Sequence, residues 1–190
     1  ELCEDIVCNG IPAGVRATVN ENGAPKNIQG LEHLSKAVYA MVCNLKPTLA
    51  AALGIPLQEL IIVNVQLHGH HPGETHGSRL HQDNAYFASK MPNGICTAWI
   101  PLQDMWEDNS CLLYIPRSHL GGTCLHKRIG QLRTRSGVTG RALYIDESVS
   151  RIPQDAWVQH VQLGDLCLHL GNTMHGSRQN STDTSTYAIS

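Results

Sequence analysis

The sequence predicts a mainly β protein with flanking helices (α+β), in which a β-sandwich or barrel has its helices packed outside. Three observations indicate this class. A segment with helical periodicity occupies residues 30–54, and a run with a two-residue period follows at 60–70. Short strand-like runs separated by turn signals then continue to the last residue. Many short strands after one helical segment are typical of this architecture.

The length and charge fit one domain that acts on a small molecule. A chain of 190 residues with 42% apolar content can bury a core as a single domain, 1–190. Only 16% of the residues are charged and the net charge is -2, which argues against nucleic acid or an anionic membrane as the main partner. No apolar run approaches the roughly 20 residues of a membrane span. A small-molecule substrate is therefore expected, and an oligomer is possible.

The seven cysteines and the two ends of the chain indicate its setting. Seven is an odd number, and the sequence has no C-x-x-C pair, which argues against a disulfide scaffold or a structural zinc site. We therefore expect an intracellular, cytoplasmic protein. The sequence starts at Glu1 and stops at Ser190 inside a predicted strand. We expect a domain that is incomplete at both ends, so any organelle-targeting signal would not be visible.

The first elements are a weak extended stretch at 15–19 and a helical segment at 30–54. Pro47 lies inside the helical pattern, so we predict two helices or one kinked helix. Gly54 and Pro56 are helix-ending residues, and they place the end of this segment.

The run at 60–70 alternates apolar and polar residues, as a half-buried strand does. The apolar face consists of Ile61, Val63, Val65 and Leu67, and the other face of Ile62, Asn64, Gln66, His68 and His70. This pattern suits the wall of a barrel whose lumen is a site, and equally a surface sheet with one wetted face. The polar residues are therefore either ligand-binding groups or a hydrogen-bonded lining.

Six further strands are predicted, with one long irregular segment between them. The segment at 123–155 is basic and rich in Ser, Gly and Thr, so we predict a long loop or lid. Its basic part at 126–135 either meets a phosphate or CoA group or forms a solvated loop face. The predicted strands are Arg79–Phe87, Ile95–Leu102, Cys111–Ile115, Val158–Val161, Asp165–Leu170 and Thr186–Ser190.

The triplet H-Q-D at 81–83 is the first part of a predicted metal site. On a strand, residues i and i+2 face the same way, so His81 and Asp83 would project together. Two histidines and one carboxylate form the facial triad that binds ferrous iron and leaves positions open for other ligands. One histidine is still missing from this set.

The third ligand is sought between residues 164 and 177, where the sequence offers two histidines. His169 lies among leucines in a predicted strand and is interpreted as a packing residue. His175 follows the turn-prone G-N-T and precedes Gly176, so it would sit at a strand end. Either a metal ligand or a surface histidine fits that place. The histidines of 68–76 suggest a second metal site, but Pro72 and Gly73 favour a loop.

Four separated blocks resemble the phytanoyl-CoA dioxygenase (PhyH) family over roughly residues 35–190. They are L-H-Q-D-N-A-Y-F (80–87), T-A-W-I-P-L-Q-D (97–104), N-S-C-L-L-Y-I-P-R-S-H (109–119) and G-D-L-C-L-H-L-G-N-T-M-H-G-S-R-Q-N-S-T (164–182). The resemblance implies a double-stranded β-helix, the jelly roll or cupin-like barrel. It also implies oxidation of a small molecule, lipid-derived or from a natural-product pathway, with Fe(II), 2-oxoglutarate and O2.

The resemblance also assigns roles to single residues. Iron would be bound by His81, Asp83 and His175. Trp99 matches the tryptophan beside the cosubstrate. The other cosubstrate positions are Ser177, His70 and Thr186. Because related halogenases have a small residue in place of the carboxylate, Asp83 implies hydroxylation or a related oxidation.

One position departs from the family pattern. Family members have an arginine at the position of Thr186, and that arginine binds the far carboxylate of 2-oxoglutarate. Arginine forms a charge-assisted bidentate pair with a carboxylate, which threonine cannot replace. Arg178 is the first candidate substitute, with a surface role as its alternative. The departure keeps two further hypotheses open: a catalytically silent partner subunit of the same fold, and an iron oxygenase that does not use 2-oxoglutarate.

The remaining candidates concern the substrate pocket. They are Asn84 and Tyr86, which follow Asp83 closely in sequence, and Trp106. They would either line the pocket or pack. Asn64, Gln66 and His68 share a predicted face with His70 and would orient substrate or cosubstrate, or only line the barrel.

Overall fold

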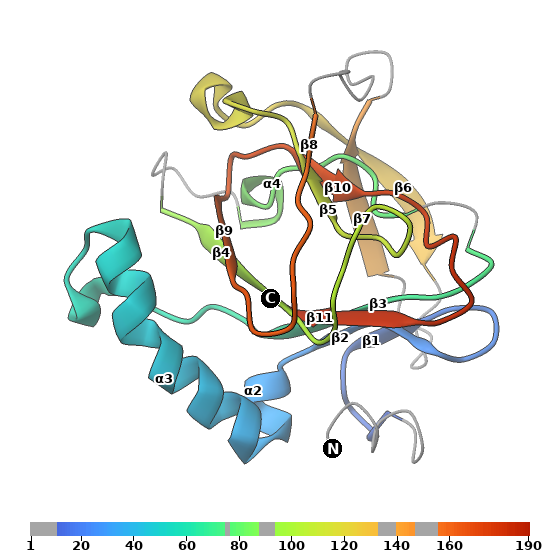
Figure 1. Cartoon of the computed structure of the whole chain (residues 1–190), viewed down its shortest axis with the longest axis horizontal. Helices are drawn as coiled ribbons and strands as arrows, with labels where there is room; N and C mark the ends of the chain where they lie inside the picture. The colour runs from blue at the N-terminus through green and yellow to red at the C-terminus, as the bar shows by residue number, and fades with distance from the viewer. Residues whose placement is uncertain (1–10, 75–76, 88–93, 133–139, 147–155) are drawn as a thin grey trace.

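The structure is a computed structural model that describes residues 11–74, 77–87, 94–132, 140–146 and 156–190 (Figure 1). The strands are β1 (Ala17–Val19), β2 (Pro25–Gln29), β3 (Gln66–His70), β4 (Cys96–Pro101), β5 (Leu112–Tyr114), β6 (His126–Leu132), β7 (Gly140–Ile145), β8 (Trp157–Val158), β9 (Cys167–Leu170), β10 (His175–Ser177) and β11 (Thr186–Ile189). The helices are α2 (Leu31–Leu34), α3 (Lys36–Leu53) and α4 (Asn84–Phe87), with short 3-10 turns η1 (Leu57–Glu59) and η2 (Ser118–Gly121). No helix in these ranges is long and apolar enough to cross a membrane.

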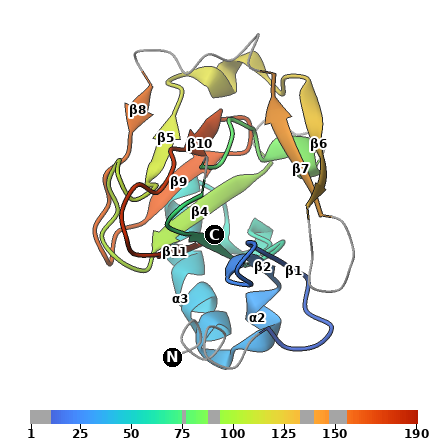
Figure 2. The same cartoon turned by 90° about the vertical axis from the view of Figure 1, so that its right-hand side faces the viewer.

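Two antiparallel sheets form the body of the domain. The larger has the strand order β1-β2-β3-β11-β4-β9, and the smaller the order β10-β5-β8. Strands β6 and β7 pair as a separate two-stranded sheet at one side (Figure 2). From β8 to β11, successive strands along the chain alternate between the two sheets, and the helices lie outside them. This arrangement confirms the predicted mainly β fold of the jelly-roll type.

Two apolar clusters cover opposite faces of the large sheet. On β11, Ala188 belongs to the cluster between the sheets, while its neighbour Ile189 belongs to the cluster under the helices. The inner cluster joins Trp99 of β4 to Leu112 of β5, so the sheets pack face to face. The polar residues of the site line the same space, which we call the lumen.

The helical segment at 30–54 consists of two helices, but the break does not fall at Pro47, the residue on which the prediction rested. The break falls at Ser35, whose side chain accepts a hydrogen bond from the Val38 N–H and caps α3. Pro47 lies within α3 and does not end it. Gly54 ends α3 in the left-handed conformation, with φ of 66°, as predicted from its position.

The strand predicted at 60–70 is shorter than expected. Only Gln66–His70 pairs with neighbours, and Ile61 and Val63 are 78% and 62% exposed. Val65 and Leu67 are buried under the helices. The prediction of one continuous apolar face was wrong for the first half, because an alternating pattern does not by itself provide a neighbouring strand.

The strand predicted at Arg79–Phe87 was also wrong. His81 forms a single bridge with His175, and the chain then turns into the short helix α4. The N–H of Tyr86 donates to the Asp83 carbonyl, which closes the first helical turn. His81 and Asp83 therefore do not share a face through the two-residue period of a strand.

The segment at 123–155 contains the hairpin β6–β7 where a loop or lid was predicted. The Ile145 N–H donates to the Leu80 carbonyl at 2.8 Å, so the hairpin is joined to the segment that carries His81. Residues 133–139 and 147–155 of this prediction lie outside the described residues. The predicted strands at 95–102, 111–115, 165–170 and 186–190 are confirmed as β4, β5, β9 and β11.

Candidate metal centre

Two chain segments far apart in sequence meet at the site through their backbones. The His81 N–H donates to the His175 carbonyl at 2.9 Å, and the His175 N–H donates to the His81 carbonyl at 3.0 Å. The Ser177 N–H donates to the Ser78 carbonyl at 2.9 Å. This reciprocal pairing fixes the two histidines at neighbouring positions.

Gly176 permits this close approach. A Cβ atom at this position would lie 2.6 Å from the Ser78 carbonyl oxygen and 3.3 Å from the backbone of Leu80. The nearest atoms all belong to the backbone of residues 78–80, so no flexible side chain could move aside. Glycine is therefore needed here for packing between the two ligand-bearing segments.

Substitution of Gly176 by alanine is expected to lower the free energy of unfolding by about 1–3 kcal/mol, the usual cost of overpacking. It should also weaken metal binding, because His175 must shift with its backbone. Gly121→Ala is the matched control, since a Cβ there meets nothing within 4 Å. Chemical denaturation of both variants measures the difference, and equal stability of the two would contradict this account.

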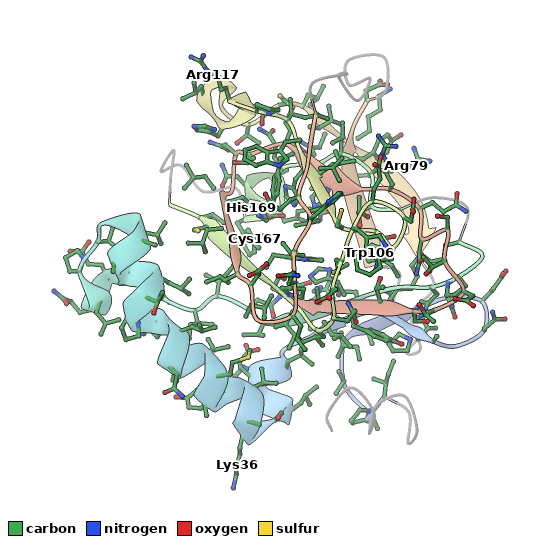
Figure 3. The ribbon with its side chains drawn as sticks, viewed as in Figure 1. Lys36, Arg79, Trp106, Arg117, Cys167 and His169 are labelled. Atoms are coloured by element: carbon green, nitrogen blue, oxygen red, sulfur yellow. The ribbon has the colours of Figure 1, made fainter. Side chains whose placement is uncertain are left out.

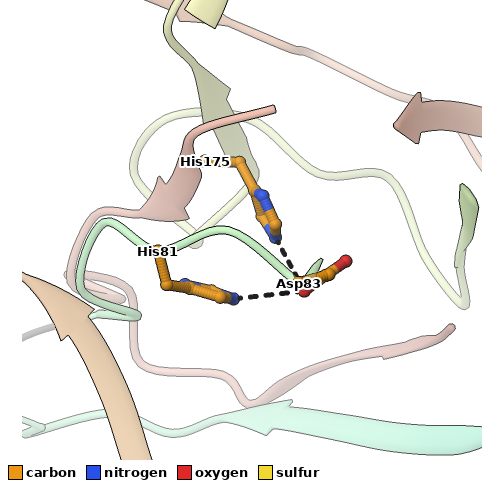
Figure 4. A group of neighbouring side chains, drawn as sticks. All are labelled: His81, Asp83 and His175. Carbon is orange, nitrogen blue, oxygen red and sulfur yellow. Dashed lines mark ion pairs between the residues drawn. The ribbon is translucent and has the colours of Figure 1, made fainter. Parts of the chain in front are cut away.

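The side chains of His81, Asp83 and His175 converge in the lumen (Figure 4). Each histidine places its Nε2 atom 3.6 Å from the same carboxylate oxygen, Oδ1 of Asp83. One potential ligand atom from each residue lies within 4.8 Å of the others. The convergence predicted from sequence is therefore present, and binding of a metal by these residues stays a prediction.

A hydrogen bond at the other ring nitrogen, Nδ1, orients each imidazole toward the common point. Nδ1 of His81 lies 2.8 Å from the Arg79 carbonyl, and Nδ1 of His175 lies 2.9 Å from the Thr173 carbonyl. A carbonyl only accepts, so Nδ1 carries the proton in both rings. Each Nε2 therefore faces the cluster, where it can bind a metal ion once it carries no proton.

The charges of the cluster suit a cation. Burial alone would raise the pKa of Asp83, but hydrogen bonds from His169 and His81 hold it well below its usual value. Burial and the neighbouring histidines hold the pKa of His175 well below its usual value. Burial opposes a charge on His81 too, yet its hydrogen bond with Asp83 raises the pKa of His81. An ionised carboxylate beside a neutral imidazole is a suitable donor set for a divalent transition metal.

Gln82 anchors the loop between the two ligands. Its side chain is completely buried and donates to the carbonyls of Gly122 and Asn172. Its Oε1 accepts from the Cys124 N–H at 2.7 Å. A buried amide with all these partners rigidifies the H-x-D turn. Sequence reasoning missed this residue, because its partners are 40 to 90 positions away.

Of the predicted cosubstrate residues, Trp99 carries the clearest sign of a ligand. It is 6% exposed, and its Nε1–H has no acceptor in the part of the chain that the structure describes. A buried donor without a partner costs about 1–3 kcal/mol, so a bound ligand is its expected acceptor. Ser177 is also buried, and its Oγ accepts from the Ser78 N–H at 2.9 Å.

His70 and Thr186 lie opposite each other on β3 and β11. Both are buried, and the Thr186 hydroxyl donates to the Asn109 carbonyl at 2.9 Å. Burial lowers the pKa of His70 to about 4, which makes it neutral at pH 7. This pair therefore forms an uncharged part of the lining.

No described arginine stands in for the arginine expected at position 186. Arg178, the candidate substitute, is exposed and pairs with Glu107. Arg79 lies over the ring of Tyr144, and Arg117 projects outward from the body (Figure 3). All arginine side chains that the structure describes are exposed, and none of the described lysines is buried.

The substrate candidates differ in their surroundings. Asn64 and Gln66 accept internal hydrogen bonds from Gly30 and Asn27, at the β2 side of the sheet. His68 bonds to the Ser190 hydroxyl at 2.8 Å, and its ring lies 4.9 Å from that of Trp99, so it borders the lumen. Their roles toward a substrate stay predictions.

Two candidates follow the metal motif directly. The Asn84 side-chain amide donates hydrogen bonds to the Thr123 hydroxyl and to the side-chain oxygen of Asn172. Tyr86 is 47% exposed, its ring stands edge-on 6.0 Å from that of His81, and its hydroxyl bonds to the backbone of Leu143. Tyr86 therefore lies beside a predicted metal ligand and also reaches solvent.

The two other segments that were predicted to bind a ligand, the His-rich stretch and the basic segment, make contacts within the protein. His71 bonds to the Ser185 hydroxyl and the Pro25 carbonyl, each at 2.9 Å. Among the described residues, the His-rich stretch at 68–74 contributes no cluster that could hold a metal ion. In the basic segment, Lys127 is exposed and pairs with Asp146.

His169 was interpreted as a packing residue, and its polar contacts were missed. Its Nε2 lies 3.1 Å from Oδ2 of Asp83, and its Nδ1 lies 3.1 Å from the Tyr114 hydroxyl. Thr97, also missed, donates to the same Oδ2 at 2.6 Å. The alternation along β4 and β9 could have placed Thr97 and His169 on one face, but their register with Asp83 is not visible in the sequence.

Two histidines and a carboxylate that converge in the lumen of a jelly roll form the residue set of a facial triad, the arrangement found in non-haem iron oxygenases. The family model of Phytanoyl-CoA dioxygenase (PhyH) matches residues 13–186, and the chain belongs to this family.

Among curated proteins, Phytanoyl-CoA dioxygenase domain-containing protein 1 of Bos taurus is 31% identical over 108 residues. The match covers 57% of this chain and 36% of the bovine protein, so it involves only part of that relative's length.

Solved structures share the fold. EvdO2 from Micromonospora carbonacea var. aurantiaca has a TM-score of 0.68 at 21% identity, covering 86% of this chain and 64% of that chain. SnoK from nogalamycin biosynthesis has a TM-score of 0.65 at 19% identity, covering 98% and 69%. These likenesses confirm the jelly-roll architecture.

Proposed function

We propose that this domain is a non-haem Fe(II)- and 2-oxoglutarate-dependent dioxygenase that hydroxylates or otherwise oxidises a C–H bond of a small molecule. The observation that carries the proposal is the geometry of His81, Asp83 and His175, with both Nε2 atoms turned toward one carboxylate oxygen. Structural relatives support the cosubstrate: EvdO2 has been solved with 2-oxoglutarate, and SnoK is a non-heme alpha ketoglutarate dependent carbocyclase.

The donor set fits ferrous iron. His81, Asp83 and His175 would hold the ion, and three ligands would leave positions for a chelating acid and O2. The iron would supply the oxidising chemistry, while the protein supplies position and electrostatics. The hydrogen bonds at Nδ1 turn the Nε2 atoms of both histidines toward the ion, and metal binding would displace any proton that these nitrogens carry.

The lumen fits an anionic cosubstrate in one respect. The Trp99 Nε1–H is a buried donor without an acceptor among the described residues, and a carboxylate oxygen would satisfy it. The far carboxylate of 2-oxoglutarate would meet Thr186 and a neutral His70 in place of the arginine. We therefore expect weaker binding of 2-oxoglutarate than an arginine would provide, because a charge-assisted pair is about twice as strong as a neutral one.

The substrate is proposed to be a lipid-derived or natural-product molecule that approaches from the side of Tyr86. This side chain is half exposed and lies beside the His81 ring. A second candidate function, an iron oxygenase that uses no 2-oxoglutarate, is favoured by the uncharged lining at Thr186. A catalytically silent subunit is the third hypothesis, and it requires that the site bind no iron.

Anaerobic titration of the Fe(II) protein with 2-oxoglutarate tests the proposal. We expect a visible charge-transfer band, because a keto acid that chelates iron through two oxygens produces one, and we expect Thr186→Arg to lower the concentration of 2-oxoglutarate needed. Iron binding without a band would favour the second candidate. Failure to bind iron would contradict the proposal and favour the silent subunit.

A further inference from the structure

The two oxygens of the Asp83 carboxylate have different surroundings. Oδ1 faces the Nε2 atoms of His81 and His175, each at 3.6 Å. Oδ2 faces away from them and is contacted by Thr97 Oγ1 at 2.6 Å and by His169 Nε2 at 3.1 Å. One oxygen is therefore directed toward the proposed metal, and the other is held by protein donors.

The register of the large sheet places both donors side by side. Thr97 of β4 and His169 of β9 are direct cross-strand partners, so their side chains project from the same face into the lumen. Figure 3 shows His169 inside the body of the domain, and its side chain is only 3% exposed. His169 therefore contacts Oδ2 from a position that water hardly reaches.

The hydrogen bonds of His169 also define its tautomer. A carboxylate only accepts, so Nε2 carries the proton that points at Oδ2 of Asp83. In the neutral ring Nδ1 is then an acceptor, to which the Tyr114 hydroxyl donates at 3.1 Å. The chain Tyr114–His169–Asp83 orients the imidazole on one side and the carboxylate on the other.

We propose that His169 is a positioning residue for the metal centre, which holds Asp83 so that it binds the ion through Oδ1 alone. This inference rests on the proposed function. If Oδ2 were free to turn inward, the carboxylate could bind through both oxygens and occupy a position that the chelating acid or O2 requires. Partners of metal ligands fix ligand orientation in this way in many sites.

Binding of Co(II) to the protein, followed by visible absorption, tests the proposal without turnover. His169→Leu is expected to weaken Co(II) binding by roughly 10- to 100-fold, the usual cost of losing such a partner. Its Co(II) spectrum should also change, because the bands depend on the number and geometry of ligands. Tyr114→Phe should give a smaller change in the same direction.

Two further variants separate positioning from packing. His169→Gln places an amide N–H donor near the position of Nε2, so it should keep the wild-type spectrum and bind Co(II) within several-fold of wild type. His71→Leu also removes a buried histidine with two hydrogen bonds, but away from the site. It should lower stability and leave the Co(II) affinity unchanged.

The outcomes are distinguishable. Wild-type affinity and spectrum in His169→Leu would overturn the inference and leave the metal site intact. Equal loss in His169→Gln and His169→Leu would overturn it too, and would favour His169 as a direct ligand. If His169→Leu does not fold, His169→Gln and Tyr114→Phe are compared with the wild type. Weaker Co(II) binding by Tyr114→Phe than by the wild type supports the inference. Wild-type affinity and spectrum in Tyr114→Phe, or a large loss in His169→Gln, would overturn it. No Co(II) binding by the wild type would overturn the metal site itself.

Discussion

Replacement of His175 by alanine is expected to lower the affinity for Fe(II) by more than about 100-fold, because loss of an outer-shell partner alone costs 10- to 100-fold. Oxygen-dependent consumption of 2-oxoglutarate should fall below detection. The reason is geometric: His175 supplies one of two imidazole nitrogens, 3.6 Å from the carboxylate oxygen that completes the cluster. Anaerobic Fe(II) titration and a succinate assay measure both effects.

His71→Ala is the matched control for this variant. His71 is also buried, at 3% exposure, and also makes two hydrogen bonds, but to Ser185 and Pro25. The His71→Ala variant should be less stable than the wild type but should bind Fe(II) with wild-type affinity. If both variants bind Fe(II) as the wild type does, His175 is not a ligand and the proposed centre is wrong.

Acidification is expected to destabilise the metal-free protein steeply between pH 6.5 and pH 4. Burial lowers the pKa of His70 to about 4, and burial also lowers the pKa of His68 to about 3. The unfolded chain takes up these protons near its ordinary pKa of about 6.5, whereas the folded chain does not. Protonation therefore favours the unfolded state as the pH falls, until the folded-state pKa is reached.

The size of this effect follows from the pKa shift. At pH 5, 1.5 units below the unfolded value, His70 alone should cost about 2 kcal/mol at 1.36 kcal/mol per unit. His70 is 8% exposed, so solvent screens little of it. Urea denaturation at pH 7 and pH 5 measures the difference, and His70→Gln should reduce it by about that amount. An unchanged pH dependence in His70→Gln would refute the assignment.

Protonation of these residues also bears on the proposed cosubstrate site. His70 lies opposite Thr186, where the far carboxylate of 2-oxoglutarate is proposed to bind. The only groups facing that carboxylate from this strand pair are then neutral at pH 7. This is why the exchange of Thr186 for arginine is expected to raise the affinity for 2-oxoglutarate.

Several features followed from sequence because their causes are local. Gly54 ends α3 through contacts within a few residues, and it was recognised from its place alone. The predicted strands β4, β5, β9 and β11 each carry enough apolar residues to be seen in isolation. The family blocks, in addition, selected His175 over His169 as the third member of the cluster.

Other predictions were wrong or incomplete because the features depend on residues far away in the sequence. The alternating run at 60–64 has no neighbouring strand, and the predicted strand through Asp83 is limited to the bridge of His81 to His175, because the chain then turns into α4. The polar role of His169 depends on Asp83, 86 positions away. A leucine-flanked histidine gives the same local pattern whether its ring packs or donates.

The sequence by itself determined the fold class, the family and the three residues that converge, since residue type and local periodicity carry that information. Only the tertiary structure decided how they converge: the backbone approach at Gly176, the partners that turn each Nε2 inward, and the donors that hold one oxygen of Asp83. Hydrogen bonds and close contacts between segments far apart along the chain set these relations, and their register appears only when the sheets are assembled.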